Sequence, residues 1–286
     1  MPLSRGIIFI WRNKLVDKLG SHDIVDEALL DDIKSLLRAG DFAKAEQQLL
    51  DIVAAGSDHD EVFYMLAVCQ RYLKKYSAAL SNLDKLKSLV PDHSRGHQET
   101  GHVYKAMNRA DAALNAYSRA IQINPALFAS FRGQIDILSA TGRESVTGPL
   151  KRQLESLEAL PKVLVVVMDL IAHGKLVKAE ELCKGFMQKV PRHIEGMRLL
   201  ADIGNRLGVL EDAEFLLESA IEFSPDSTQV RIDYIHVLRK RQKYEEALAQ
   251  AKLLLAKDPK NPQFQSVFAI ESMQSGDYDT ALETFD

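Results

Sequence analysis

Strong net charge, long apolar runs and abundant cysteine are all missing from this sequence of 286 residues. Lys and Arg total 36 against 40 Asp and Glu, so the formal net charge is −4 and there is no basic excess of the kind usual in nucleic-acid-binding domains. The most apolar runs, 6–11 and 163–168, are far shorter than the roughly 20 residues of a membrane-spanning helix. We therefore expect neither nucleic acid nor a membrane among the partners, and a cytoplasmic location.

Catalytic and cofactor motifs are missing as well. The sequence has no G-x-x-x-x-G-K-[ST] or G-x-G-x-x-G phosphate loop, and no H-E-x-x-H, C-x-x-C or G-x-S-x-G motif. The nearest approach to a metal site is His93, His97 and His102, but we expect Ser94 to cap a helix there and His102 to lie off the face that the other two would share. We expect no enzyme activity, no cofactor and no metal in this chain.

What the sequence does contain is a repeat of 34 residues. Pro91 and Pro125 are 34 apart, and so are successive members of Pro191, Pro225 and Pro259. Proline lacks an amide hydrogen and disfavours helix in the residue before it, so each one separates two helices. Aligned on these prolines, the repeats begin at Asp26, Asp60, Ser94, Phe128, Leu160, Ile194, Thr228 and Pro262.

Two positions of the repeat predict antiparallel helix hairpins. Position 20 reads Ala45, Ala79, Ala113, Thr147, Ala179, Ala213, Ala247 and Ala281. Position 15 reads Gly40, Lys74, Asn108, Gly142, Gly174, Gly208, Gln242 and Gly276. Small residues allow two helix axes to approach closely, and Gly and Asn accept the left-handed conformation in which helices end. The sequence therefore predicts an all-α array of about eight hairpins.

The pattern resembles the tetratricopeptide repeat over residues 26–286. The residues that carry the resemblance are Phe63, Leu66, Ala67, Ala79 and Pro91, then Gly101, Tyr104, Ala113, Tyr117, Ala120 and Pro125, then Leu200, Ala201, Ala213, Ala220 and Pro225. The resemblance implies a right-handed superhelical array, or solenoid. It also implies a protein-protein interaction scaffold that holds a partner segment in its concave groove.

Four segments follow from the register. We expect a capping helix over 1–25, hairpins one to three over 26–127, an irregular fourth hairpin over 128–159, and hairpins five to eight over 160–286, the last truncated. The fourth hairpin has Thr147 where alanine is expected, followed by Gly148 and Pro149, which predicts a long loop and a shortened helix from about Pro149. Drift in a tolerant repeat and a hinge between the flanking arrays are both open interpretations.

The resemblance also implies where a partner binds, because the first helix of each hairpin lines the concave surface. The residues that carry over are Tyr64, Arg71, Arg95, Gln98, His102, Lys105, Arg132, Leu164, Met168, Ile171, Arg198, Asn205, His236 and Arg239. The members from hairpins two to four are net basic, and those from hairpin five are apolar. We expect an extended peptide, acidic at one end and with an apolar anchor. The alternatives are an ordinary solvated face, and an apolar patch that packs within the array.

The end of the chain suggests an alternative function. Asp286 falls in the middle of the last hairpin's second helix, which would leave Phe285 at an open edge and predicts a longer parent protein. Residues 276–282 are similar to those of bacterial proteins that join such repeats to a sulfotransferase domain. That likeness implies a non-catalytic, substrate-presenting or dimerising N-terminal arm of a larger enzyme. If the hairpin is instead the natural end, it would offer a surface for a homodimer.

The two cysteines are expected to lie too far apart to form a disulfide. The register places Cys69 and Cys183 on buried faces three hairpins apart, whereas a disulfide needs Cα atoms within about 7 Å. We expect both to be buried, reduced thiols, as is usual in a reducing compartment.

Overall fold

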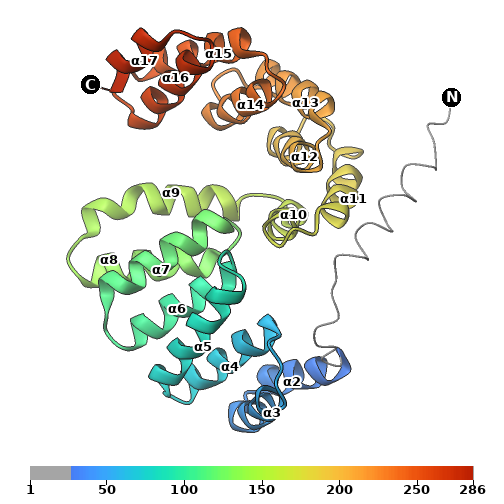
Figure 1. Ribbon diagram of the computed structural model, residues 1–286, viewed down its shortest axis with the longest axis vertical. Coiled ribbons are helices and arrows are strands. Elements are labelled where there is room, and N and C mark those ends of the chain that lie inside the picture. The colour runs from blue at the N-terminus through green and yellow to red at the C-terminus, as the bar shows by residue number, and fades with distance from the viewer. Residues whose placement is uncertain (1–26, 286) are drawn as a thin grey trace, which may run out of the picture. The chain divides into compact units, whose positions relative to one another are not determined.

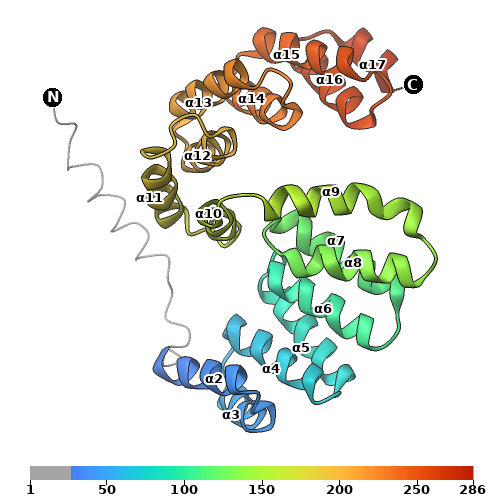
Figure 2. The same ribbon diagram turned by 180° about the vertical axis from the view of Figure 1, so that it is seen from behind.

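The computed structural model describes residues 27–285, so the helix predicted over 1–25 lies outside the described residues. All the regular structure described is helical, with no strand between residues 27 and 285 (Figures 1 and 2). The helices are α2 (Glu27–Ala39), α3 (Phe42–Ala54), α4 (Asp60–Tyr72), α5 (Tyr76–Leu89), α6 (Ser94–Ala106), α7 (Ala110–Ile123), α8 (Phe128–Ala140), the 3-10 helix η1 (Glu144–Val146), α9 (Thr147–Glu158), α10 (Lys162–Ala172), α11 (Leu176–Met187), α12 (Ile194–Leu207), α13 (Leu210–Phe223), α14 (Thr228–Lys240), α15 (Tyr244–Lys257), α16 (Pro262–Gln274) and α17 (Tyr278–Phe285). None of these helices combines the length and apolar character needed to cross a membrane.

The chain divides into two compact units. Of the described residues, unit 1 contains 27–123 together with 127–148, and unit 2 contains 124–126 together with 149–285. In unit 1, α4 packs on α5 and α6 on α7; in unit 2 the pairs are α10 with α11, α12 with α13, α14 with α15 and α16 with α17 (Figure 1). Each unit is therefore a stack of helix hairpins, and the predicted all-α repeat fold is confirmed.

The predicted register is also confirmed. Helices α4, α6, α8, α12, α14 and α16 begin at the residues that the proline alignment gives, and α10 begins two residues later, at Lys162. All eight residues at position 20 are buried, from Ala45 at 0% exposed to Ala281 at 6%. These alanines lie where the two helices of a hairpin meet, so a larger side chain there would force the axes apart.

Every residue at position 15 has a positive φ. The glycines at this position range from 69° to 90°, and Lys74, Asn108 and Gln242 adopt 61°, 57° and 60° without being glycine. The left-handed residue turns the chain so that the next N–H reaches back across the end of the helix, as in the 2.7 Å bond from Lys75 N to Gln70 O. This closure ends the first helix of the hairpin and sets the start of the second.

The fourth hairpin differs from the prediction of a long loop over 141–148. Helix α8 is followed by the 3-10 turn η1, and α9 already begins at Thr147, two residues before the predicted start, with Pro149 in its first turn. Thr147 is only 2% exposed, and its Oγ1 donates to Glu144 O at 2.8 Å. The helix starts early because Thr147 fills the buried position that alanine fills elsewhere. Proline is tolerated at Pro149 because the first N–H groups of a helix have no partner within the helix.

The apolar residues predicted to line a groove in hairpin five belong to the core instead. Leu164, Met168 and Ile171 are 0%, 6% and 5% exposed, and they pack with residues of α11 and α12. The prediction of an apolar anchor site there was wrong. Side chains of this kind gain free energy by being covered, and their neighbours within unit 2 cover them.

The predicted state of the cysteines is confirmed. Cys69 and Cys183 are both free and fully buried. Burial raises the pKa of the Cys69 thiol to about 12 and that of Cys183 to about 11. Both side chains therefore stay protonated and behave as small apolar core residues.

Candidate functional site

In unit 1, the predicted groove residues lie on α4, α6 and α8, the first helices of their hairpins. Tyr64, Gln98 and His102 are half-buried, while Arg95, Lys105 and Arg132 are exposed. Several of them already contact the neighbouring hairpin. Lys105 Nζ lies 2.8 Å from Asp136 Oδ2, and Gln98 Oε1 accepts from Ser130 Oγ at 3.0 Å. The face is therefore less basic than its cations suggest.

Arg71 is tied to a carboxylate that the sequence analysis missed. Its Nε donates to Oε1 of Glu99 on α6, and its Nη2 lies 3.4 Å from Oε2, while the guanidinium stacks 4.2 Å from the Tyr72 ring centroid. Glu99 is 4% exposed, and burial raises its pKa against the opposing effect of Arg71. Because the guanidinium neutralises this carboxylate, Arg71 is a structural link between hairpins two and three.

The side chain of His102 likewise makes its contacts within unit 1. A 2.7 Å hydrogen bond joins its Nδ1 to the Tyr117 hydroxyl, and the two rings meet edge to face. Burial, helped by the nearby charges of Arg71 and Lys105, lowers the pKa of His102 from 6.5 to about 4. The imidazole is therefore neutral at physiological pH, and it supports Tyr117 in the core.

In unit 2, three predicted residues do come together. A cavity of about 240 Å³ opens between the first helices α12 and α14 and contains Arg198, Asn205 and His236. Its full lining is Arg198, Ala201, Asp202, Asn205, Arg206, Leu217, Asp233, His236 and Val237. Arg239, also predicted, lies outside this lining and pairs with the fully buried Glu271 of α16. We call this cavity the α12–α14 pocket.

Ion pairs within the α12–α14 pocket balance its charge. Arg198 bonds Glu195 through two nitrogens and donates from Nη1 to Asp233 Oδ2 at 2.8 Å, and these carboxylates keep the pKa of Arg198 far above its usual value despite burial. Arg206 Nε donates to Asp202 Oδ1 at 3.0 Å. With two arginines opposed by at least two carboxylates, the pocket has no strong preference for either sign of charge.

Unused hydrogen-bonding groups remain on the walls of the α12–α14 pocket. Asn205 Oδ1 accepts from Lys240 Nζ at 2.7 Å, which leaves the Asn205 amide N–H groups, and Asp202 uses only Oδ1. His236 has no hydrogen-bond partner among residues 27–285, and partial burial of its ring, followed by the charge of Arg239, lowers its pKa. A neutral imidazole offers one donor and one acceptor, so the walls of the pocket carry both kinds of unused group.

The histidines of the possible metal site have other roles. His93, not Ser94, caps α6: its Nδ1 accepts from Gly96 N at 2.9 Å, so the predicted Ser94 cap was wrong. His59 and His193 cap α4 and α12 in the same way. In the described part of the chain no three His, Cys, Asp or Glu side chains gather as metal ligands would.

Comparison with known families settles the fold family. Tetratricopeptide repeat models match residues 30–94, 95–127 and 205–269, which together make up more than half of the chain. The chain is a tetratricopeptide repeat protein. No curated protein matches it. Tetratricopeptide repeats form protein-interaction scaffolds, and this chain has that architecture in both units.

Solved structures of repeat proteins resemble the chain at low identity. A tetratricopeptide repeat protein from Parabacteroides merdae is 16% identical, with 86% of this chain and 98% of that chain covered and a TM-score of 0.40. A thermophilic repeat protein from Thermus thermophilus is also 16% identical, covering 75% and 100%, with a TM-score of 0.34. In the APC/C hetero-tetramer Cut9–Hcn1, the match is 12% identical and covers 91% of this chain and 52% of that chain, with a TM-score of 0.39.

Proposed function

We propose that this scaffold holds an extended segment of a partner protein against α12 and α14, with the segment's backbone in the α12–α14 pocket. One observation carries the proposal: three of the residues predicted to contact a partner, Arg198, Asn205 and His236, line a single open cavity. Asp202, at another first-helix position, lines it as well.

The chemistry of the pocket favours a peptide backbone over a strongly charged ligand. Its arginines are neutralised by Glu195, Asp202 and Asp233, so a charged ligand gains little there. The Asn205 amide, Asp202 Oδ2 and the neutral imidazole of His236 together present both donors and acceptors. An extended backbone offers both C=O and N–H groups, so it can pair with these groups without leaving buried polar groups unpaired.

A triple substitution tests the proposal. The variant Asp202→Ala, Asn205→Ala, His236→Ala removes the unused groups, and Glu218→Ala, Glu222→Ala, Lys252→Ala changes three exposed residues of α13 and α15 as a matched control. Each tagged protein is purified from source cells, and copurifying proteins are measured by quantitative mass spectrometry. We expect a partner that is retained by the wild type and the control and reduced about tenfold or more by the pocket variant. Equal recovery with all three proteins would contradict the proposal.

The basic residues of unit 1 give a separate prediction. An acidic partner segment on the first helices of unit 1 would contact Arg95, Lys105 and Arg132, of which Lys105 is already paired with Asp136. Replacing all three by alanine should weaken such a partner mainly through a slower association rate, because exposed charges act chiefly on encounter. Surface plasmon resonance with the purified partner measures that rate, and an unchanged rate would exclude this mode of binding.

A further inference from the structure

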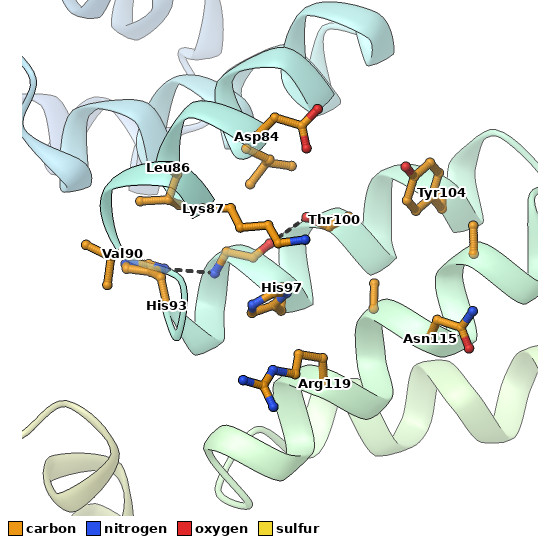
Figure 3. A pocket seen from close by; sticks show the side chains of 14 residues that line it. Asp84, Leu86, Lys87, Val90, His93, His97, Thr100, Tyr104, Asn115 and Arg119 are labelled. Atoms are coloured by element: carbon orange, nitrogen blue, oxygen red, sulfur yellow. Dashed lines mark hydrogen bonds between the residues drawn. The ribbon is translucent and has the colours of Figure 1, made fainter.

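A second cavity lies in unit 1, between the second helices α5 and α7, with α6 as its floor (Figure 3). Its volume is about 370 Å³, within the usual range for ligand sites in proteins. Its lining is Leu83, Asp84, Leu86, Lys87, Val90, His93, Gly96, His97, Thr100, Tyr104, Ala112, Asn115, Ala116 and Arg119. We call it the α5–α7 pocket. It shares no residue with the predicted partner groove.

The pocket exists because the floor helix has small and polar residues where a related hairpin has large apolar ones. Hairpins three and six share the motif His-x-x-Gly, in which His93 or His193 caps the first helix by accepting from the glycine N–H. In hairpin six the positions after this motif carry Met197 and Leu200, which pack into the core.

In hairpin three the same two positions carry His97 and Thr100, both half-buried. Ala112 and Ala116 of α7 add no bulk on the facing wall. The space that Met197 and Leu200 fill in hairpin six is therefore left accessible in hairpin three.

The hydrogen-bonding groups of the floor are largely used within the chain. His97 Nε2 donates to Pro91 O at 2.9 Å, and Thr100 Oγ1 donates to Gly96 O at 2.9 Å. The strongest groups left for a ligand are therefore the cations on the two walls, Lys87 and Arg119.

Lys87 extends from α5 and Arg119 from α7, with His97 between them (Figure 3). Lys87 is exposed and has no ion pair among residues 27–285. Arg119 uses one nitrogen on the exposed Asp92, at 2.6 Å, and keeps its other N–H groups. Asp84 is the one carboxylate in the lining, and Figure 3 shows it at the opposite end of the pocket from Arg119.

Apolar surface adjoins these cations. The half-buried side chains of Val90, Ala112 and Ala116 line the cavity, and the buried Leu83 and Leu86 adjoin it. A small ion would leave this apolar surface in contact with water. A peptide with an apolar side chain beside a carboxylate would cover it. From the cations and this surface we infer that the α5–α7 pocket binds an acidic segment of a partner protein. A carboxylate of that segment lies between Lys87 and Arg119, and a neighbouring apolar side chain packs on Val90, Ala112 and Ala116.

Methyl NMR of the full chain tests this inference with defined probes. Protein labelled with ¹³C at Leu and Val methyl groups is titrated with acetyl-Glu-Leu-Glu-amide, with acetyl-Gln-Leu-Gln-amide and with inorganic phosphate. We expect saturable shifts of the Leu83, Leu86 and Val90 methyl signals with the glutamate peptide, weakened by added salt. We expect much smaller shifts with the glutamine peptide.

Two charge-matched double variants complete the test. Lys87→Gln, Arg119→Gln removes the cations of the pocket, and Lys44→Gln, Lys85→Gln removes two exposed lysines of α3 and α5 that do not line it. The first should weaken the glutamate peptide about fivefold or more, and the second should leave its affinity unchanged. Melting curves verify that both variants fold.

Four results would overturn the inference. The first three are the absence of shifts at the highest soluble peptide concentration, equal binding of the two peptides, and equal binding by the two variants. The fourth is saturation by phosphate without saturation by the glutamate peptide, because the pocket would then be a site for small anions.

Discussion

At the scale of single residues, the packing around Tyr117 leaves no space for a side chain at two neighbouring glycines. Its ring is fully buried between Gly101 of its own hairpin and Gly133 of the next. A Cβ added at Gly101 would lie 2.6 Å from two ring carbons, and one at Gly133 would lie 2.7 Å from two others. Neither glycine has a positive φ, so both are required by the space around them and not by backbone conformation.

Gly101→Ala should therefore destabilise the protein. The buried ring has no room to move aside, so we expect a loss of about 1–3 kcal/mol in the free energy of unfolding, measured by urea denaturation. Gly185→Ala is the matched control, because nothing lies within 4 Å of a Cβ there and the residue is exposed within α11. That control should gain about 0.5–1 kcal/mol. A Gly101→Ala variant as stable as the wild type would refute this account of the packing.

His102 should make the protein sensitive to acid. Its pKa is about 4 in the folded protein against 6.5 ordinarily, so between these values the unfolded chain binds more protons than the folded one. Stability from this residue is complete above pH 6.5 and is lost as the pH falls towards 4. His102→Gln should flatten the fall in melting temperature between pH 7 and pH 4.5, measured by differential scanning calorimetry. Parallel pH profiles for variant and wild type would contradict the prediction.

At the scale of helices, three first helices begin with a histidine cap. His59, His93 and His193 each place Nδ1 on a backbone N–H of the first helical turn. The ring also packs on an aromatic neighbour at two of these caps, His93 on Tyr64 and His193 on Phe186. Capping by histidine satisfies a donor that the helix itself leaves unpaired.

Substitution of His193 tests the value of such a cap. His193→Ala removes the acceptor and should cost about 1 kcal/mol in the free energy of unfolding. His193→Asn supplies an amide oxygen that caps well, so it should recover most of that loss, apart from the contact with Phe186. Chemical denaturation measures both. If the asparagine variant is no more stable than the alanine variant, the ring contact and not the hydrogen bond matters at this helix start.

The helices were largely predictable from the sequence because the residues that set where each helix begins and ends lie within its own hairpin. Alanine stands at position 20 in seven of the eight hairpins, and position 15 has a positive φ in all eight. The positive φ holds even at Lys74 and Gln242, where residue type alone would not suggest a turn. The early start of α9 was missed because Thr147 can substitute for alanine in the buried position, which the Gly148-Pro149 pair obscured. Two of the three histidine caps, His93 and His193, had a detectable signal in the repeated His-x-x-Gly motif.

The candidate site was harder to predict than the fold. The repeat register gives the direction of a side chain, but it does not show what covers that side chain. Leu164 was therefore placed on a surface although neighbouring helices enclose it. Glu99 was missed because the neutralising partner of Arg71 comes from the next hairpin, 28 residues away. Arg206 lies one turn after Asp202, and that spacing would have indicated their pairing.

At the scale of the whole molecule, ion pairs between neighbouring hairpins recur in both units. Lys75 bonds Glu46 at 2.6 Å and Lys243 bonds Glu214 at 2.7 Å, at the same two positions of the repeat. Arg241 also bonds Glu214, and these two cations lower the pKa of that carboxyl despite burial. Since each hairpin in a repeat protein contacts chiefly its neighbours, such pairs couple adjacent hairpins into a cooperative stack.

The Arg71–Glu99 pair offers the sharpest test of this coupling. Arg71→Met leaves the buried carboxylate of Glu99 without a counter-charge and should cost about 3–5 kcal/mol in the free energy of unfolding. Arg71→Met combined with Glu99→Leu should restore most of that loss, because neither charge then remains buried. A double-mutant cycle by urea denaturation measures the coupling. Additive single effects would show that the two hairpins are not linked through this pair.

Hydrogen exchange of the scaffold bound to its partner tests the central claim most directly. The partner is the protein identified by the purification that compares the wild type with the α12–α14 pocket variant. If the chain holds a partner segment as proposed, amide protection on binding should concentrate in α12 and α14, with α13 and α15 changing less. Protection confined to the second helices, or absent from α12 and α14, would contradict the claim.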